Sequence, residues 1–214
     1  GLTACGTTFE LPELGELQSA QASKMFAEAR SEGPRRTLST SAGEQRFRRV
    51  APRIAQVGQQ YCKAITADRK NFNCAVDVGI DREMKIRNAY FTYEGATPKI
   101  RISMPLLQDT ASDDEVAFIL SHEYGHLIGR HIEKQKQQAL AGALILGAVT
   151  AAATAHNNPY GQYDPHAVNQ SMEIGAAAGS MAYSQTYELE SDTLGTRITK
   201  AAGYDPVKGA KFFA

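Results

Sequence analysis

The segment that most constrains the fold of this 214-residue chain is His122-Glu123-Tyr124-Gly125-His126, which lies inside a long apolar run, residues 115–128. Ser112 or Asp113 can cap the start of a helix, and the acidic side chains that follow suit the positive end of its dipole. The pattern therefore predicts a helix over about residues 112–136. In such a helix, His122 and His126 project from one face, one turn apart.

Two imidazoles placed in this way can bind one metal ion, and Glu123 between them can reach a water molecule at that metal. Zinc is the ion that such sites usually hold, so we expect one Zn²⁺ per chain. The alternative is a buried helix in which the two histidines only form hydrogen bonds within the core. A metal site is favoured, because buried polar rings need partners and one metal satisfies both at once.

A catalytic zinc site takes a third protein ligand. The metzincin spacing would need a histidine at position 132, which is Ile132, and His131 points away from the pair if the helix continues. That pattern therefore fails, and the third ligand must come from a later segment.

The segment 187–192 offers two glutamates and an aspartate. Helical periodicity puts Glu188 and Asp192 on one face, and Glu190 opposite, with Arg197 and Lys200, on the side that should meet water. Glu188 is therefore the expected third ligand, and Asp192 is expected to accept a hydrogen bond from a liganding histidine. The alternative is an ordinary helix with both acids solvated.

The chain resembles the HtpX-like zinc metallopeptidases, the group that contains the CAAX prenyl proteases. Within this group it resembles in particular a soluble bacterial lipoprotein branch. The resemblance spans about residues 45–210 and rests on four motifs: Asn88-Ala89-Tyr90, His122-Glu-x-x-His126, Glu188-x-x-x-Asp192 and Ala202-Gly203-Tyr204-Asp205-Pro206. It departs from the family where Ser191 replaces the usual alanine and Thr193 the frequent arginine.

The resemblance implies a mainly helical α+β fold of the zincin (gluzincin) type, with a small β-sheet beside the metal helix. It also implies a zinc endopeptidase with His122, His126 and Glu188 as metal ligands. In that interpretation Glu123 is the general base that takes a proton from water and passes it to the leaving amine. The sequence leaves open which of Tyr183, Tyr187, His166 and Arg197 supplies an oxyanion donor.

We expect residues 1–42 to form an N-terminal arm and linker, with a helix near 15–30, and residues 43–214 to form the metallopeptidase domain. Leu2-Thr3-Ala4-Cys5 is similar to a bacterial lipobox, which would make Cys5 a lipidated residue and the protein periplasmic and attached to the membrane. The alternative is an incidental cysteine. No segment reaches the roughly 20 apolar residues that span a bilayer.

Cys62, near the end of a predicted helix over 43–66, and Cys74, in the next strand-like run, are twelve residues apart. A disulfide between them would persist in the periplasm. The alternative is that the two cysteines are buried free thiols. A competing class of protein is an intracellular peptidase whose cysteines are free.

Three strands are predicted, near residues 74–78, 86–93 and 99–104. The zincin resemblance suggests that Ile100, Arg101, Ile102 and Ser103 form a sheet edge that holds an extended substrate as an added strand. The alternative is a strand fully paired within the sheet.

Residues 139–155 form a run of small and apolar side chains without a polar face. We expect this run to be buried, with core packing favoured over an oligomer or partner contact or a cover over the active site. The loop that follows carries His156 and His166, which are expected to be solvated; the alternative is that one of them reaches the metal.

The formal net charge of zero favours neither nucleic acid nor an acidic membrane surface as a partner. The family resemblance implies a zinc-dependent endopeptidase that acts on unfolded or damaged envelope polypeptides. The alternative is a catalytically silent, zinc-bound chaperone or adaptor of the same fold.

Overall fold

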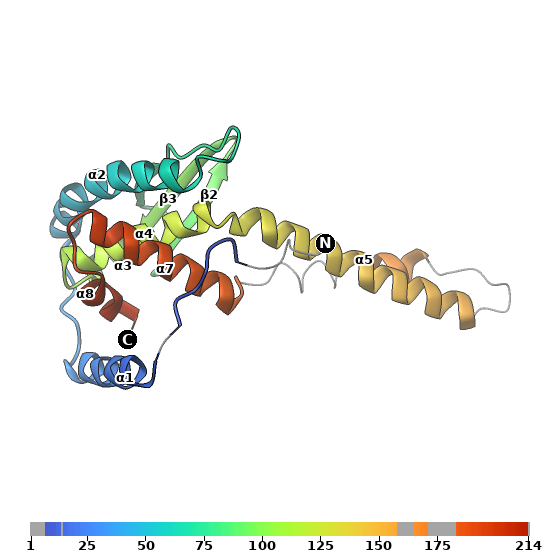
Figure 1. Cartoon of the computed structure of the whole chain (residues 1–214), viewed down its shortest axis with the longest axis horizontal. Coiled ribbons are helices and arrows are strands. Elements are labelled where there is room, and N and C mark those ends of the chain that lie inside the picture. Colours follow the sequence, from blue (N-terminus) through green and yellow to red (C-terminus); the bar gives the residue numbers. More distant parts are fainter. Residues whose placement is uncertain (1–6, 14, 158–164, 171–182, 214) are drawn as a thin grey trace. The chain divides into compact units, whose positions relative to one another are not determined.

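A computed structural model of the chain describes residues 7–13, 15–157, 165–170 and 183–213 (Figure 1). Its helices and strands, in chain order, are α1 (Glu16–Ser31), α2 (Thr40–Ile65), β1 (Asp77–Asp81), β2 (Ala89–Glu94), β3 (Thr97–Ser103), α3 (Met104–Asp109), α4 (Asp113–Ile128), α5 (His131–Asn157), α7 (Gln185–Ala201), α8 (Pro206–Ala210) and the 3₁₀ turn η1 (Lys211–Phe213). The predicted α+β class, mainly helical with one small sheet, is confirmed. Cys5 lies outside the described residues.

The chain divides into two compact units. The core unit comprises Phe9–Gly129 and Leu189–Ala214, and the second unit comprises Gly1–Thr8 and Arg130–Glu188. The linker after α1 bonds to other residues of the core unit. Leu38 N donates to Gln108 O at 2.7 Å, and Arg35 pairs with the buried carboxylate of Glu115 at 2.6 Å.

Helix α4 lies at the centre of the core unit, where it contacts α2, α8 and strands β2 and β3 (Figure 1). Helix α2 buries Val50, Ile54, Gly58 and Cys62, which recur every four residues and so form one face. Gly58 matters here because a Cβ atom at this position would lie 2.9 Å from the ring of Tyr124. The absence of a side chain at Gly58 therefore lets α2 approach α4 closely.

A disulfide joins Cys62 and Cys74, the pair that the sequence predicted, with Cα atoms 5.8 Å apart. It ties the end of α2 to the segment that leads into β1. The bridge therefore fixes one edge of the sheet relative to the helix that packs on α4.

The sheet has the order β1-β3-β2, with β1 parallel and β2 antiparallel to β3. The expectation that Ile100–Ser103 form a sheet edge is therefore wrong. Ile100 pairs with Val78 on one side and Phe91 on the other, and Ile100 and Ile102 are fully buried. The alternating pattern of this strand reflects the pleat, which central and edge strands share. Among the described strands, the edges are β1 and β2.

Helix α4, which carries His122 and His126, is shorter than predicted. Helix α4 ends at Ile128, Gly129 caps it, and Arg130 has a φ of 56° before α5 starts at His131. A residue in the left-handed region cannot continue a right-handed helix, so α4 ends with the apolar run at residue 128 and not near the predicted residue 136. The predicted bounds of α1, α2 and the strands fall within a few residues of those observed.

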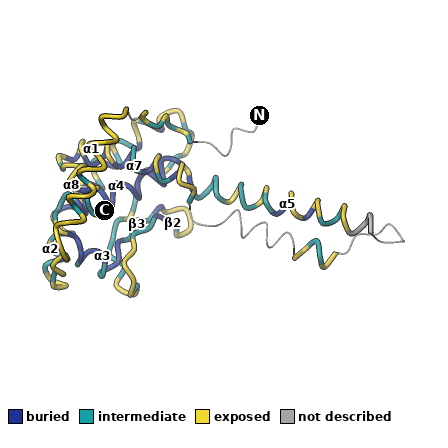
Figure 2. The backbone as a smooth tube through the Cα atoms, turned by 90° about the horizontal axis from the view of Figure 1, so that it is seen from below, coloured by how far each residue is buried: buried dark blue, intermediate teal, exposed yellow. Residues whose placement is uncertain are grey.

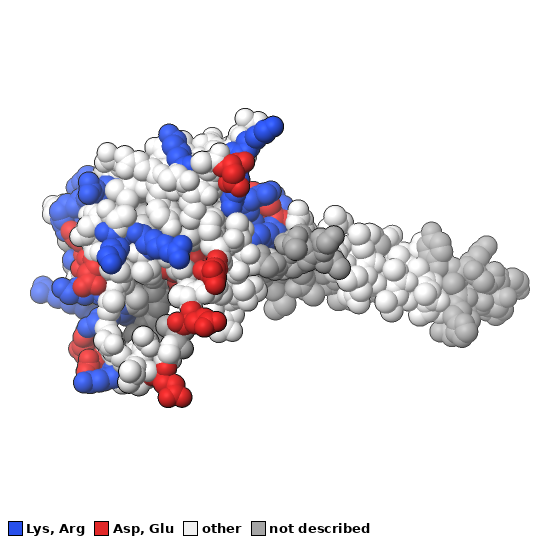
Figure 3. Space-filling view, in the orientation of Figure 1, with Lys and Arg blue, Asp and Glu red and all other residues white. Residues whose placement is uncertain are grey.

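Residues 139–155 lie in α5, and core packing of the whole run, the favoured expectation, is wrong for most of its described side chains. Leu140, Leu144, Ile145 and Val149 are 62%, 59%, 62% and 60% exposed. Figure 2 shows the contrast between the alternating colours of α5 and the continuously buried α4. In Figure 3 the visible described surface of α5 beyond its first turns is free of charged atoms.

Among the helices that the structure describes, including α5, none combines the length and the apolar character that a membrane span requires.

Candidate metal centre

The start of α4 is fixed by polar contacts within the core unit. The Ser112 hydroxyl accepts a hydrogen bond from Glu115 N at 3.2 Å, as an N-cap does. Arg49 donates two hydrogen bonds to the Asp113 carboxylate, at 2.9 and 3.1 Å, and thereby lowers the pKa of Asp113. These contacts orient the helix that carries the histidines.

His122, Glu123 and His126 form one buried cluster near the end of α4, and their ligand atoms lie within 4.8 Å of one another. The three residues are only 8%, 7% and 3% exposed. The two imidazole rings meet at 84°, and their Nε2 atoms lie 3.1 Å apart. The helical spacing thus brings both rings to a single point, as predicted from the sequence.

Each histidine has a partner at its other ring nitrogen. Nδ1 of His122 lies 2.8 Å from Oδ1 of Asp192, and Nδ1 of His126 lies 3.0 Å from Oγ of Ser191. Asp192 therefore takes the position that its helix face predicted. The contact of Ser191 was not predicted, since the sequence marked this residue only as a departure from the family pattern.

Helices α4 and α7 cross at two glycines. A Cβ atom on Gly125 would lie 2.6 Å from Cα of Ser191, and one on Gly195 would lie 2.9 Å from the backbone nitrogen of His122. No side chain fits at either position without displacing backbone. The two glycines therefore allow the close approach that brings Ser191 and Asp192 within hydrogen-bond distance of the histidines.

The donor set fits a divalent metal. An ionised Asp192 can only accept a hydrogen bond, so Nδ1 of His122 carries the proton and Nε2 presents its lone pair. Two ligand nitrogens of a tetrahedral zinc site, each about 2.0–2.1 Å from the ion, lie about 3.3 Å apart. The observed separation of 3.1 Å is close to this value. A metal between the two Nε2 atoms is therefore compatible with the rings as they stand.

The carboxylates of α7 follow the sequence prediction only in part. Glu188 lies one helical turn before Asp192 and is half-buried. Glu190 was expected to meet water, and this is wrong: its side chain is fully buried and accepts a hydrogen bond from Phe9 N at 2.7 Å. The N-terminal segment covers this face of α7, which helical periodicity alone could not reveal. Arg197 and Lys200 are exposed, as expected.

A family model described as peptidase family M48 matches residues 48–213, which is most of the chain. The chain belongs to this family. The HtpX-like resemblance is thereby confirmed, and with it a family of metal-dependent peptidases.

Two curated relatives of this M48 chain are themselves named as peptidases. The mitochondrial metalloendopeptidase OMA1 of Arabidopsis thaliana is 30% identical over 108 residues, which cover 50% of this chain and 20% of the relative. The beta-barrel assembly-enhancing protease of Yersinia pestis is 26% identical over 121 residues, covering 56% of this chain and 24% of the relative. The chain thus matches only about a fifth to a quarter of the length of these proteins.

The residues considered as oxyanion donors in this M48 chain have different surroundings. Tyr187 is buried, stacks on His131 with ring centroids 4.7 Å apart, and accepts a hydrogen bond from Gln138 at 3.1 Å. Tyr183 lies 5.8 Å from the same His131 ring. Arg197 and His166 are exposed, whereas the side chain of His156 lies outside the described part of the chain. These positions do not single out one donor.

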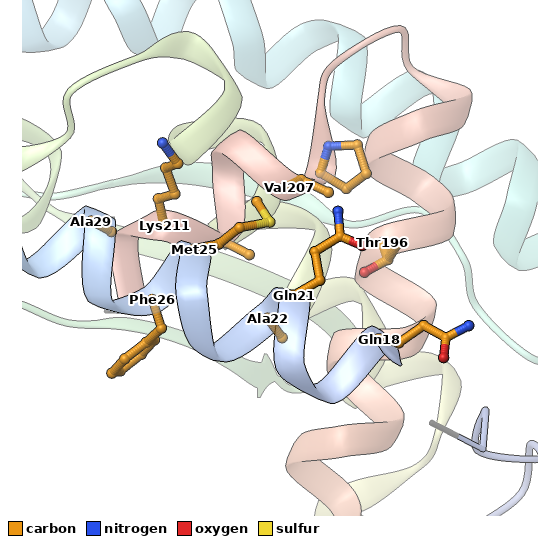
Figure 4. Close-up of a pocket in the computed structure, with 11 residues that line it drawn as sticks. Gln18, Gln21, Ala22, Met25, Phe26, Ala29, Thr196, Val207 and Lys211 are labelled. Atoms are coloured by element: carbon orange, nitrogen blue, oxygen red, sulfur yellow. The ribbon is translucent and has the colours of Figure 1, made fainter. Parts of the chain in front are cut away.

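A groove of about 410 Å³ lies away from the histidines, between α1 and the C-terminal segment (Figure 4). Met25 and Phe26 line it from α1, Thr196 from α7 and Val207 from α8. None of the residues that line this groove belongs to the cluster of His122, Glu123 and His126. The groove is therefore distinct from the site where the M48 chain can bind a metal.

Proposed function

We propose that this chain is a zinc-dependent endopeptidase that hydrolyses peptide bonds in unfolded or damaged envelope proteins. One observation carries the proposal. Two buried imidazoles face each other at 3.1 Å with their Nδ1 atoms already partnered, and Glu123 lies within the same cluster. Membership of peptidase family M48 supports the same chemistry.

The residues of the chain have separate roles in this proposal. His122 and His126 hold the ion through Nε2, and Asp192 and Ser191 orient the two rings. A zinc ion bound here supplies a Lewis acid for the scissile carbonyl and lowers the pKa of water at the site. Glu123 takes the proton from the attacking water and delivers it to the leaving amine.

Glu188 is the proposed third ligand. Asp192 faces His122, and Glu188 precedes it by one turn of the same helix, so helical periodicity gives both carboxylates the same side of α7. A site with three protein ligands keeps one coordination position for substrate chemistry. This is the arrangement that the gluzincin resemblance implies.

An extended substrate segment would pair with β2. Among the described strands, β2 is the edge that contacts α4, whereas β3 is paired on both sides. Pairing through backbone groups tolerates many side chains, and it requires a locally unfolded segment. This requirement supports unfolded or damaged polypeptides as the substrate class.

The proposed location is the periplasm, with attachment to the membrane through lipidated Cys5. The disulfide between Cys62 and Cys74 supports an oxidising compartment. The name of the Yersinia relative refers to the assembly of β-barrel proteins, which suggests envelope substrates. A fractionation of cells that carry the natural protein or a Cys5→Ser variant tests the anchor, because only the natural protein should stay with membranes.

The experiment that tests the proposed activity combines metal analysis with cleavage of casein, an unfolded protein. Glu123→Gln should bind as much zinc as the natural protein and should lose cleavage, because an amide cannot accept the proton. Equal cleavage by the variant would refute the role of Glu123. Full zinc occupancy without cleavage by the natural protein would favour the second candidate, a zinc-bound chaperone or adaptor.

A further inference from the structure

Ser191 is the partner of His126, and nothing in the proposed catalytic steps requires a hydroxyl at this position. Its Oγ lies 3.0 Å from Nδ1 of His126, and the serine is fully buried. The family pattern stated above has an alanine here, which would leave no hydroxyl beside the ring. The serine is therefore a feature of this chain that calls for a physical explanation.

We propose that Ser191 is a positioning residue of the metal site, and that its hydroxyl strengthens metal binding by accepting a hydrogen bond from Nδ1 of His126. This inference rests on the proposed function only in that it requires a metal at Nε2 of both histidines. It does not require that the chain cleaves peptides.

The Ser191 hydroxyl can bond the imidazole of His126 in two ways. Without a metal, Nε2 of His126 can donate to Nε2 of His122, and the Ser191 hydroxyl can then donate to Nδ1 of His126. With a metal at both Nε2 atoms, the proton of His126 must sit on Nδ1, and the Ser191 hydroxyl must accept it. A serine satisfies both states, because a hydroxyl is both donor and acceptor.

The two states differ in the strength of this hydrogen bond. A ring that binds a cation carries more positive charge on its remaining N–H, and charge-assisted hydrogen bonds are about twice as strong as neutral ones. Ser191 therefore stabilises the metal-bound state more than the metal-free state. Removal of the hydroxyl should weaken metal binding even though the free protein also loses a hydrogen bond.

The position of the hydroxyl is fixed by the backbone. Cα of Ser191 lies so close to Gly125 that a Cβ atom on this glycine would be 2.6 Å away. Since Gly125 directly precedes His126, the serine cannot move away from the ring without separation of α4 from α7. A hydroxyl held in this way sets the direction of the imidazole as well as its tautomer.

The test measures zinc affinity by competition with a chelator, for the natural protein, Ser191→Ala and Ser121→Ala. Ser121 is the matched control: it is equally buried, it directly precedes His122, and its hydroxyl has no hydrogen-bond partner among the described residues. We expect Ser191→Ala to bind zinc about 10- to 100-fold more weakly, which is the usual effect of removing such a partner. Ser121→Ala should bind zinc as the natural protein does.

Two further measurements separate positioning from folding. Circular dichroism of the metal-free proteins establishes that each variant is folded at the temperature of the titration. Ser191→Thr retains the hydroxyl and should restore most of the affinity, and the visible spectrum of bound Co²⁺ should change in Ser191→Ala but not in Ser121→Ala.

The outcomes distinguish this inference from the proposed function. Natural affinity in Ser191→Ala, or an equal loss in Ser191→Ala and Ser121→Ala, would overturn the role of Ser191 and leave the zinc peptidase proposal intact. A threonine variant as weak as the alanine variant would overturn it as well. A natural protein that binds no zinc would instead refute the metal centre itself.

Discussion

Helices α4 and α5 follow each other in the chain and both are rich in apolar residues, yet their burial differs. Every residue of α4 from Glu115 to Ile128 is buried, whereas several large side chains of α5 are more than half exposed. Residues 137–157 contain no charged side chain. Apolar composition therefore did not decide which helix is buried.

The difference lies in the contacts that each helix makes within its own unit. Helix α4 contacts α2, α8 and two strands of the sheet, and its buried polar groups have specific partners in Asp192, Ser191 and Arg35. Partners for both apolar and polar groups are what make a fully buried helix stable. A helix that exposes its apolar residues, as α5 does, gains less stability from burial although its composition is also apolar.

The sharpest test of this comparison is a pair of leucine substitutions. Leu120→Ala in α4 should lower the free energy of unfolding by about 2–5 kcal/mol, because it leaves a cavity at a fully buried position. Leu144→Ala in α5 should change it by no more than about 0.5 kcal/mol, because that side chain is 59% exposed. Urea unfolding followed by circular dichroism measures both. Equal effects would show that the two helices are buried alike in solution.

A second prediction concerns the disulfide beside α4. Replacement of Cys62 and Cys74 by alanine should cost about 2–4 kcal/mol, because the bridge restricts the unfolded chain over twelve residues. Amide hydrogen exchange should show the loss of protection in α2 and α4. Loss confined to α5 would contradict the assignment of the bridge to the core unit.

A third prediction concerns the carboxylates of α7. Glu188→Gln should lower zinc affinity by at least about 100-fold, or about 2.7 kcal/mol, because the amide removes an anionic ligand. Glu190→Gln is the control on the same helix and should retain zinc, since an amide oxygen can still accept the hydrogen bond of Phe9. The reverse result, with zinc lost only in Glu190→Gln, would exclude Glu188 as the ligand.

The smallest predicted effect lies at the start of α4. The hydrogen bonds from Arg49 lower the pKa of Asp113 in the folded protein, so the carboxylate contributes stability above the pKa of the unfolded chain. This contribution should be lost as pH falls below about 4, through the lowered folded value. In the Asp113→Asn variant this contribution should be absent at every pH. The substitution should therefore lower the free energy of unfolding at neutral pH by less than about 1 kcal/mol. Thermal unfolding of the natural protein and of the variant between pH 7 and pH 3 measures this contribution. A difference in stability between the two proteins that grows as the pH falls would contradict the role of the ion pair between Arg49 and Asp113.

The sequence predicted the parts of the site that depend on local periodicity. His122, Glu123 and His126 come together because one helix carries them, and Asp192 reaches His122 from the predicted face of α7. Cys62 and Cys74 are joined, as their spacing suggested.

The remaining features depend on contacts between distant segments, which periodicity does not encode. Phe9 covers Glu190, β1 pairs with β3 from the other side, and Gly125 admits the backbone of Ser191. For the same reason, the exposure of α5 could not be read from its composition.

The most direct test of the metal centre is the zinc content of the purified protein after dialysis against zinc and removal of the excess. The natural chain should retain one zinc ion, and a variant with His122→Ala and His126→Ala should retain none. A natural chain that retains no zinc, or a double variant that retains one, would contradict the central claim that the paired imidazoles of α4 hold the metal.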